Sequence, residues 1–316
     1  MAIIRDYLQV KETYQNAAEK KWVIPCFCSE NLTTTEAILS AAQEFAADNG
    51  LSRVPVTLAI TVQYDHRSQS KNYTHTRRWD TGLKLFCAAA DVLAGPDGPF
   101  PNVDVLLHLD HVQHDNDKEL LTWDLSDFSS IMYDASTLPF EDNIKSTAAF
   151  VEKMKDKIFI EGACDEIFDA AGQTHNALTT PENAKRYCDE TGVDLIVANL
   201  GTEHRASGQT LHYYSDIARE IKDQVGPRLV LHGLSSVSLD QLKNLYNDGI
   251  CKANIWTILE RDSSPVLLDE MTKNAHYISG AKAAISHFTT VWRQDIVFAE
   301  MKKIVRTFFD LFYGDK

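Results

Sequence analysis

Eight short apolar runs, rich in β-branched residues, recur along the chain and constrain its fold more than any other feature. Runs of this kind are typical of strands that are buried on both faces of a parallel sheet. The runs comprise residues 22–27, 54–62, 103–109, 130–133, 158–161, 195–198, 229–232 and 250–255.

The stretches between these runs have helical character. Residues 35–47 repeat apolar side chains at helical spacing, and residues 181–191 start with Pro181 after Thr180 as N-cap. Residues 238–248 begin with a loose capping box and end at Gly249. Eight strands alternating with helices over 316 residues predict an α/β fold, a (β/α)8 TIM barrel, with a doubly wound open sheet as the alternative.

We expect residues 1–316 to form a single domain, because no linker, repeat or low-complexity tract divides them. Two long loops, residues 64–79 and 164–179, follow predicted strands and should lie over the catalytic face, either as lids or as solvated surface loops. Residues 283–313 predict extra C-terminal helices, whose apolar stripe would serve ordinary core packing or dimerisation.

The formal net charge of −14 argues against nucleic acid or an anionic membrane surface as a partner. The first residues lack the apolar core of a signal peptide, and no segment approaches the length of a membrane span. The six cysteines are scattered and predict reduced thiols in a cytoplasmic protein rather than a disulfide framework.

Three of the runs deliver a histidine where the strand ends. Val103–Leu107 leads into His108-Leu109-Asp110-His111, the run at 229–231 leads into His232, and the run at 194–198 leads to His204. Parallel strands place their carboxyl ends at the face where such folds perform chemistry. Three imidazoles with an acid beside them predict a metal site, with zinc preferred and cobalt, manganese or iron as substitutes.

A site of this kind suits carbon–carbon cleavage next to a ketone. Zinc held by three imidazoles keeps a position open for a substrate oxygen and would stabilise an enediolate as a Lewis acid. Asp110 would move the proton of a hydroxyl during cleavage. His108 lies two residues before Asp110, shares its face, and is expected to support the site rather than bind metal.

Several motifs, in the same order, resemble the class II, metal-dependent ketose-bisphosphate aldolases, especially the tagatose-bisphosphate and short fructose-bisphosphate branch. They are Ile24-Pro25-Cys26-Phe27 with Asn31-Leu32, His108-Leu109-Asp110-His111, the segment 130–144, Thr191-Gly192-Val193-Asp194, Gly201-Thr202-Glu203-His204, the segment 229–233 and the segment 249–255.

The resemblance implies that His111, His204 and His232 bind one Zn²⁺ and that Asp110 is the proton donor to the nascent C4 hydroxyl, or the base in cleavage. It implies that Asn254 contacts the enediolate. It further implies a carbohydrate substrate and a homodimer or higher homo-oligomer. The other candidate substrate-binding residues are Asn31, Thr61, Arg205, Gly233, Ser235 and Thr257, with Ser235 at the phosphate end of the donor and Thr61 near it.

The chain departs from the family pattern where the donor phosphate would bind. Arg205 stands where a glycine is expected after His204, Ser236 replaces the last glycine of the motif after His232, and Trp256 is bulky for its position. Glycines matter there because they let backbone N–H groups approach a phosphate closely. The acidic loop that supplies a proton-abstracting glutamate is not recognisable, and Asp165, Glu166 and Asp169 remain equivalent candidates.

Two explanations of these departures compete. We favour an aldolase that cleaves a ketose or keto-sugar derivative other than the usual bisphosphate. The alternative retains the phosphate but binds it with arginines, either Arg205 or Arg77 and Arg78. A retro-aldol sugar epimerase and a non-catalytic relative that binds metal or ligand are further alternatives.

Overall fold

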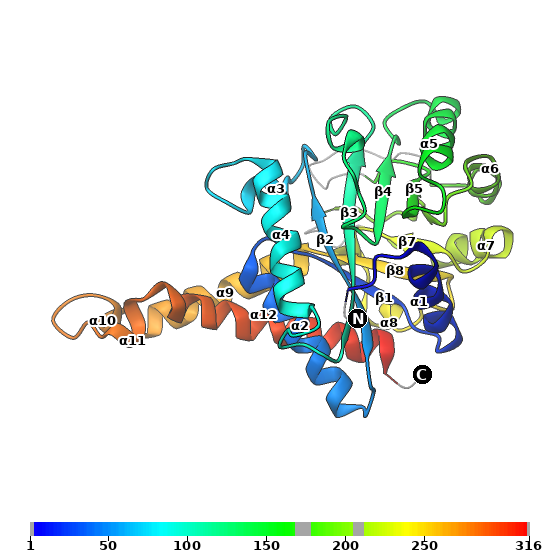
Figure 1. Ribbon diagram of the computed structural model, residues 1–316. Helices are drawn as coiled ribbons and strands as arrows, with labels where there is room; N and C mark the ends of the chain where they lie inside the picture. Colours follow the sequence, from blue (N-terminus) through cyan, green and yellow to red (C-terminus); the bar gives the residue numbers. More distant parts are fainter. Residues whose placement is uncertain (1–2, 168–177, 205–211, 315–316) are drawn as a thin grey trace.

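Eight parallel strands close into a barrel in chain order, with β1 paired to both β2 and β8. The computed structural model describes residues 3–167, 178–204 and 212–314. The predicted (β/α)8 barrel is therefore confirmed, and each of the eight apolar runs contains a strand (Figure 1). The strands are β1 (Ile24–Cys28), β2 (Val54–Thr61), β3 (Val103–Gln113), β4 (Ser130–Asp134), β5 (Phe159–Ala163), β6 (Leu195–Val197), β7 (Leu229–Leu231) and β8 (Ile250–Ile255).

Helices of the described segments surround the barrel, and the last helices of the chain extend away from it (Figure 1). None of them combines the length and the apolar run needed to cross a bilayer. Their bounds are α1 (Tyr7–Glu19), α2 (Leu32–Asp48), α3 (Gln69–Asn72), α4 (Trp79–Ala94), α5 (Phe140–Met154), α6 (Pro181–Thr191), α7 (Ser215–Val225), α8 (Leu239–Leu242), α9 (Thr257–Lys273), α10 (Ala275–Ile278), α11 (Ile285–Phe288) and α12 (Thr290–Tyr313), with short 3-10 turns η1 (Leu120–Thr122) and η2 (Leu234–Ser236).

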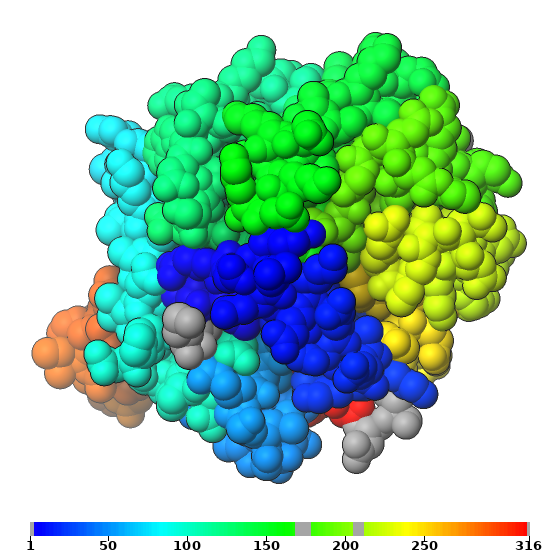
Figure 2. Space-filling model, turned by 45° about the vertical axis from the view of Figure 1, so that its right-hand side comes forward, coloured from blue at the N-terminus to red at the C-terminus, as the bar shows by residue number. Residues whose placement is uncertain are grey.

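Helix α1, which the sequence patterns did not predict, lies across the amino-terminal mouth of the barrel. Its Val10 and Ala17 are buried in one apolar cluster with residues near the strand starts, including Leu106 and Phe159. Figure 2 shows this helix in blue over the middle of one face of the molecule. The helix closes one end of the barrel, so the opposite end carries the site.

Two predicted boundaries were wrong. The helix expected over 238–248 is only the four-residue α8, because the Asn- and Asp-rich stretch after Leu242 forms turns up to Gly249. The capping box is nevertheless present, with Ser238 and Gln241 bonding to each other's backbone. Strand β3 continues beyond the expected end at 109 to Gln113.

The C-terminal helices form an arm that projects from the barrel (Figure 1). Helices α9 and α12 pack side by side, and α10 and α11 connect them at the far end. The last turns of α12 return to the barrel, where Phe308 and Phe309 pack on Phe27 of β1. The stripe considered for dimerisation is thus partly core, whereas Leu268 and Ile285 of the arm are 69% and 73% exposed.

Candidate active site

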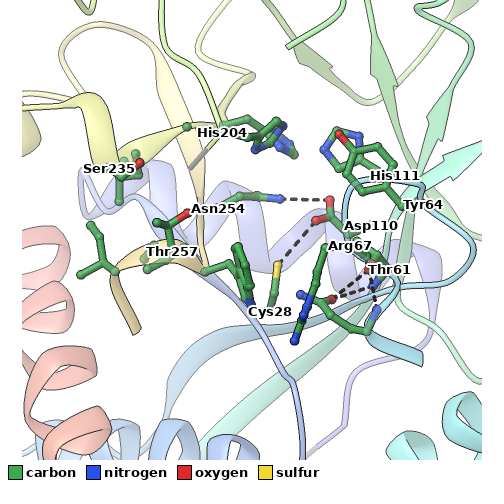
Figure 3. Close-up of a pocket in the computed structure, with 17 residues that line it drawn as sticks. Cys28, Thr61, Tyr64, Arg67, Asp110, His111, His204, Ser235, Asn254 and Thr257 are labelled. Carbon is green, nitrogen blue, oxygen red and sulfur yellow. Dashed lines mark hydrogen bonds between the residues drawn. The ribbon is translucent and has the colours of Figure 1, made fainter. Parts of the chain in front are cut away.

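Three histidines meet at the carboxyl end of the barrel. His111 lies on β3, His204 follows β6, and His232 follows β7 directly. One nitrogen from each lies within 4.8 Å of the others, and all three side chains line one cavity (Figure 3). The structure therefore brings together the three residues predicted as metal ligands, while His108 points elsewhere.

An irregular backbone at His111 lets two consecutive residues face this cavity. Neighbouring residues of a regular strand point to opposite faces. The pairing of β3 with β4 shifts register between Leu109 and Val112, and His111 has a φ of 46°. A positive φ at a residue other than glycine is uncommon and costs backbone strain. Here it brings the Asp110 carboxylate and the His111 imidazole to the same cavity.

Two buried carboxylates orient the imidazoles. Asp134 Oδ2 lies 2.9 Å from His111 Nδ1, and Glu161 Oε1 lies 3.4 Å from His232 Nε2. A carboxylate on the outer nitrogen is the usual support of a metal-binding histidine, because it fixes the ring and its tautomer.

The inner nitrogens lack partners among the described residues. His111 Nε2 and His204 Nε2 are buried without a hydrogen bond, an arrangement that is costly unless a ligand satisfies it. Burial lowers the pKa of His204 and His232, which favours the neutral imidazoles that metals require. At His111 burial acts in the same direction, but the carboxylates of Asp110 and Asp134 outweigh it and raise the pKa. The three side chains fit a divalent metal of the zinc type.

Asp110 is 3% exposed and is held from two sides. Asn254 Nδ2 donates to its Oδ1 at 3.1 Å, and the Cys28 thiol donates to its Oδ2 at 3.5 Å (Figure 3). Burial opposes ionisation, but the neighbouring histidines, His111 foremost, bring the pKa of Asp110 well below its usual range. The group is a fixed carboxylate next to the imidazole cluster, as a proton acceptor in cleavage must be.

A charged cluster that the sequence patterns did not reveal lies deeper in the barrel. Lys252 is 1% exposed, and its Nζ lies 2.6 Å from Glu161 Oε2 and 3.0 Å from His108 Nε2. Because an ammonium only donates, His108 Nε2 accepts, so His108 carries its proton on Nδ1 and donates to Ser130 Oγ. His108 is therefore a support residue, as expected from its position.

Most of the predicted substrate-binding residues line the cavity. Two of them present buried polar atoms without partners among the described residues, Ser235 Oγ and Asn254 Oδ1, as a polar ligand would require. The Thr61 hydroxyl donates to the Arg67 carbonyl, so it holds the loop after β2. The lining residues among those predicted are Thr61, Gly233, Ser235, Asn254 and Thr257.

One predicted residue, Asn31, does not line the cavity, and a second, Arg205, is neither assigned to it nor excluded from it. Asn31 is exposed and caps α2, its side chain accepting from Thr34 N at 3.2 Å, because an Asn at a helix start satisfies a free backbone N–H. Arg205 lies outside the described residues.

Sequence reasoning missed several other lining residues. Tyr64 stacks on His111 with ring centroids 4.3 Å apart, and Arg67 follows from the same loop after β2. Gln69 accepts from Thr61 N, and Trp256, noted only as bulky, lines the cavity after β8. Their place in a long loop directly after a strand was the signal that could have found Tyr64 and Arg67.

The candidate bases form a second cavity next to the first. Asp165 and Glu166 line it together with Tyr64 and His111, which border both cavities. Asp165 accepts a hydrogen bond from Thr179 at 2.6 Å, whereas burial and the charge of Asp134 raise the pKa of Glu166. Asp169 and most of the loop 164–179 lie outside the described residues.

Comparison with known proteins identifies the family of the chain. A family model described as fructose-bisphosphate aldolase class-II matches residues 8–314. The chain belongs to this family. Class II aldolases are metal-dependent lyases, in agreement with the histidine cluster.

Three solved structures share the fold. The fructose-bisphosphate aldolase of Campylobacter jejuni has a TM-score of 0.79 at 18% identity, covering 99% of this chain and 96% of its own. The YdjI aldolase of Escherichia coli K12 has a TM-score of 0.71 at 20% identity, covering 97% of each chain. A putative fructose-1,6-bisphosphate aldolase from Coccidioides immitis has a TM-score of 0.70 at 21% identity, covering 96% of each.

Proposed function

We propose that this class II aldolase uses one Zn²⁺, held by His111, His204 and His232, to cleave and form a ketose or keto-sugar derivative other than the usual bisphosphate. One observation carries the aldolase assignment: unpartnered inner nitrogens of the histidine cluster border the same cavity as the Asp110 carboxylate. Bound zinc would polarise the substrate carbonyl as a Lewis acid.

The residues of the chain account for the proton and the orientation. During cleavage the C3–C4 bond breaks, its electrons pass to the carbonyl side, and the C4 hydroxyl proton goes to Asp110. In the synthetic direction Asp110 returns that proton. Asn254 donates to Asp110 from one end of its amide, and its Oδ1 is left for a substrate hydroxyl.

The donor end supports a substrate without the usual phosphate. At the position of the expected glycine, the Ser236 hydroxyl accepts from the Glu203 N–H at 3.3 Å and donates to the Gly233 carbonyl at 2.9 Å. A serine hydroxyl thus occupies a backbone N–H that glycines would leave free for phosphate.

Two of the arginines considered for an alternative phosphate site do not line the cavity. Arg77 bonds to Asn72 and Arg78 pairs with Asp80, and neither arginine lines the cavity. Arg67 does line it, with consequences considered below.

Hydrogen exchange in heavy water tests the proposal. NMR of the zinc-loaded protein should show exchange at the hydroxymethyl carbon of dihydroxyacetone, faster than that of dihydroxyacetone phosphate. Asp110→Asn should keep zinc and this exchange but lose aldol cleavage, because the substitution removes only the C4 proton acceptor. A protein that exchanges neither ketone would not be an aldolase for these donors, and a strong preference for the phosphate would refute the substrate proposal.

We also propose a homodimer formed through the projecting arm. Its support is the exposure of Leu268 and Ile285, together with Val291 at 59%, on helices that leave the barrel. Clustered exposed apolar residues mark interaction surfaces. Sedimentation of Leu268→Glu and Ile285→Glu variants should show a shift from dimer to monomer, and an unchanged dimer would place the interface elsewhere.

A further inference from the structure

The donor half of the cavity contains a single lysine or arginine among the described residues that line it. That residue is Arg67, on the loop after β2, which is labelled among the residues that line the cavity in Figure 3. A phosphate or carboxylate end of a substrate needs a cation or several free N–H groups for binding. Among the described lining residues, this guanidinium is therefore the cation on which binding of an anionic donor would depend.

Glu30 neutralises the charge of Arg67 in a bidentate salt bridge. Arg67 Nε donates to Glu30 Oε1 at 3.1 Å, and Arg67 Nη2 pairs with Glu30 Oε2. Trp256 Nε1 also donates to Glu30 Oε1 at 2.7 Å, and the guanidinium lies 5.5 Å from the Trp256 ring. Glu30 is only 5% exposed, so this pairing is fixed rather than exchanged with solvent.

A second carboxyl group stands behind this pair. Glu260 on α9 has a buried Oε1 that no other described residue hydrogen-bonds. Burial and the charge of Glu30 raise the pKa of Glu260 to about 7, against the opposing charge of Arg67. Depending on the protonation of Glu260, the three side chains together carry a charge of zero or −1. This wall of the cavity offers no net positive charge.

We propose that Glu30 is a specificity-determining residue, which keeps Arg67 from binding an anion so that the cavity takes the neutral hydroxymethyl-ketone end of an unphosphorylated ketose. The same charge argument excludes keto-acids, whose carboxylate would meet the same neutralised arginine. The inference rests on the proposed aldolase function only for the role of the cavity as the donor site.

Calorimetric titration with glycerol 3-phosphate tests the inference on metal-free protein, independently of turnover. The wild-type protein should bind this phosphate ester only at millimolar concentration. Glu30→Gln keeps the shape of the side chain, frees the guanidinium charge, and should strengthen binding by about tenfold or more. Adding Arg67→Gln to this variant should abolish the gain. Tight binding by the wild-type protein, or no gain in a folded Glu30→Gln variant, would overturn the proposal.

Glu260→Gln is the matched control. It removes a carboxyl group from the same wall without freeing Arg67, so phosphate binding should change by no more than about twofold. An equal gain in this variant would show a general effect of charge and overturn the specific role of Glu30.

Arg67→Gln alone covers the case in which Glu30→Gln does not fold, because Arg67 is 41% exposed. The proposal expects an affinity within about twofold of wild type, whereas a tenfold loss would mean that Arg67 already holds the phosphate and would overturn the proposal. The two experiments can fail separately. If neither ketone exchanges hydrogen but the calorimetry gives the expected result, the role of Glu30 is supported and the aldolase function is rejected.

Discussion

Replacing Lys252 by Met should destabilise the protein strongly, because Lys252 is a buried charge paired with a buried carboxylate. The variant keeps an apolar stem of similar length but leaves the Glu161 carboxylate, 2% exposed, and His108 Nε2 without their buried donor. Burial opposes ionisation of Glu161, but the charge of Lys252, followed by smaller contributions from His232 and His108, lowers its pKa to about 2, from an ordinary 4.5. A difference of that size corresponds to about 3 kcal/mol, and breaking buried pairs typically costs about 3–5 kcal/mol.

Urea unfolding of the metal-free protein at pH 7, followed by circular dichroism, measures this loss. The surface pair of Lys185 with Asp189 gives the control, since Lys185→Met should cost no more than about 0.5 kcal/mol. The double variant Glu161→Gln with Lys252→Met should be more stable than the two single losses predict, by about 2 kcal/mol or more. A loss no larger than that of Lys185→Met, or strictly additive single losses, would refute the reasoning.

Three further outcomes are expected. Zinc should raise the thermal unfolding midpoint of the metal-free protein, equivalent to about 2.7 kcal/mol at a hundredfold excess over its dissociation constant, and His111→Ala should remove this shift in scanning calorimetry. Gly233→Ala should destabilise the protein by about 1–3 kcal/mol in urea titrations, because Gly233 has a φ of 68° and a Cβ there would lie 2.7 Å from the Glu203 carbonyl oxygen. Since the folded-state pKa of Glu161 lies below its unfolded value, the stabilisation from this group is present above pH 4.5 and is lost as the pH falls toward 2, so acid titration of Lys252→Met should lack this component.

The strands and the histidine cluster could be predicted because their signals are local. A parallel barrel strand is buried on both faces and appears as a continuous apolar run, and the three histidines lie within or shortly after three of the strands. Strand β3 shows the limit of this reasoning. Its last residues are polar because they face the site, so the pattern that marks a strand stops before the strand does.

The buried ionic cluster could not be predicted because its members meet only when the barrel closes. Glu161 and Lys252 lie 91 positions apart, on β5 and β8. The signals in the sequence are a lysine within the mostly apolar run 250–255 and a glutamate at the end of the run 158–161, and neither has an assigned partner until the topology is known. The contact of Glu30 with Arg67 is equally non-local, since it joins the chain after β1 to the loop after β2.

Alternate residues along neighbouring strands arrange these groups in layers. On β8 the residues at spacing two are Lys252, Asn254 and, just beyond the strand, Trp256; β1 shows the same spacing in Cys28 and Glu30. Side chains at this spacing point to the same side of a strand, here into the barrel. The contacts follow this order. The deepest layer holds Lys252, the middle layer holds Asp110, and the top layer holds Glu30, which pairs with Arg67.

Substitutions in different layers are expected to affect different properties of the protein. A change at Lys252 removes a buried charge and affects stability, whereas a change at Asn254 alters the support of Asp110 and affects turnover. A change at Glu30 or Trp256 alters the charge and shape at the mouth, and in the proposal above this is where the choice of donor is set. Loops at the mouth of a barrel can vary without disturbing the layers below them. This separation would let a member of a bisphosphate aldolase family keep its histidine cluster and Asp110 while its donor cavity takes the unphosphorylated substrate proposed above.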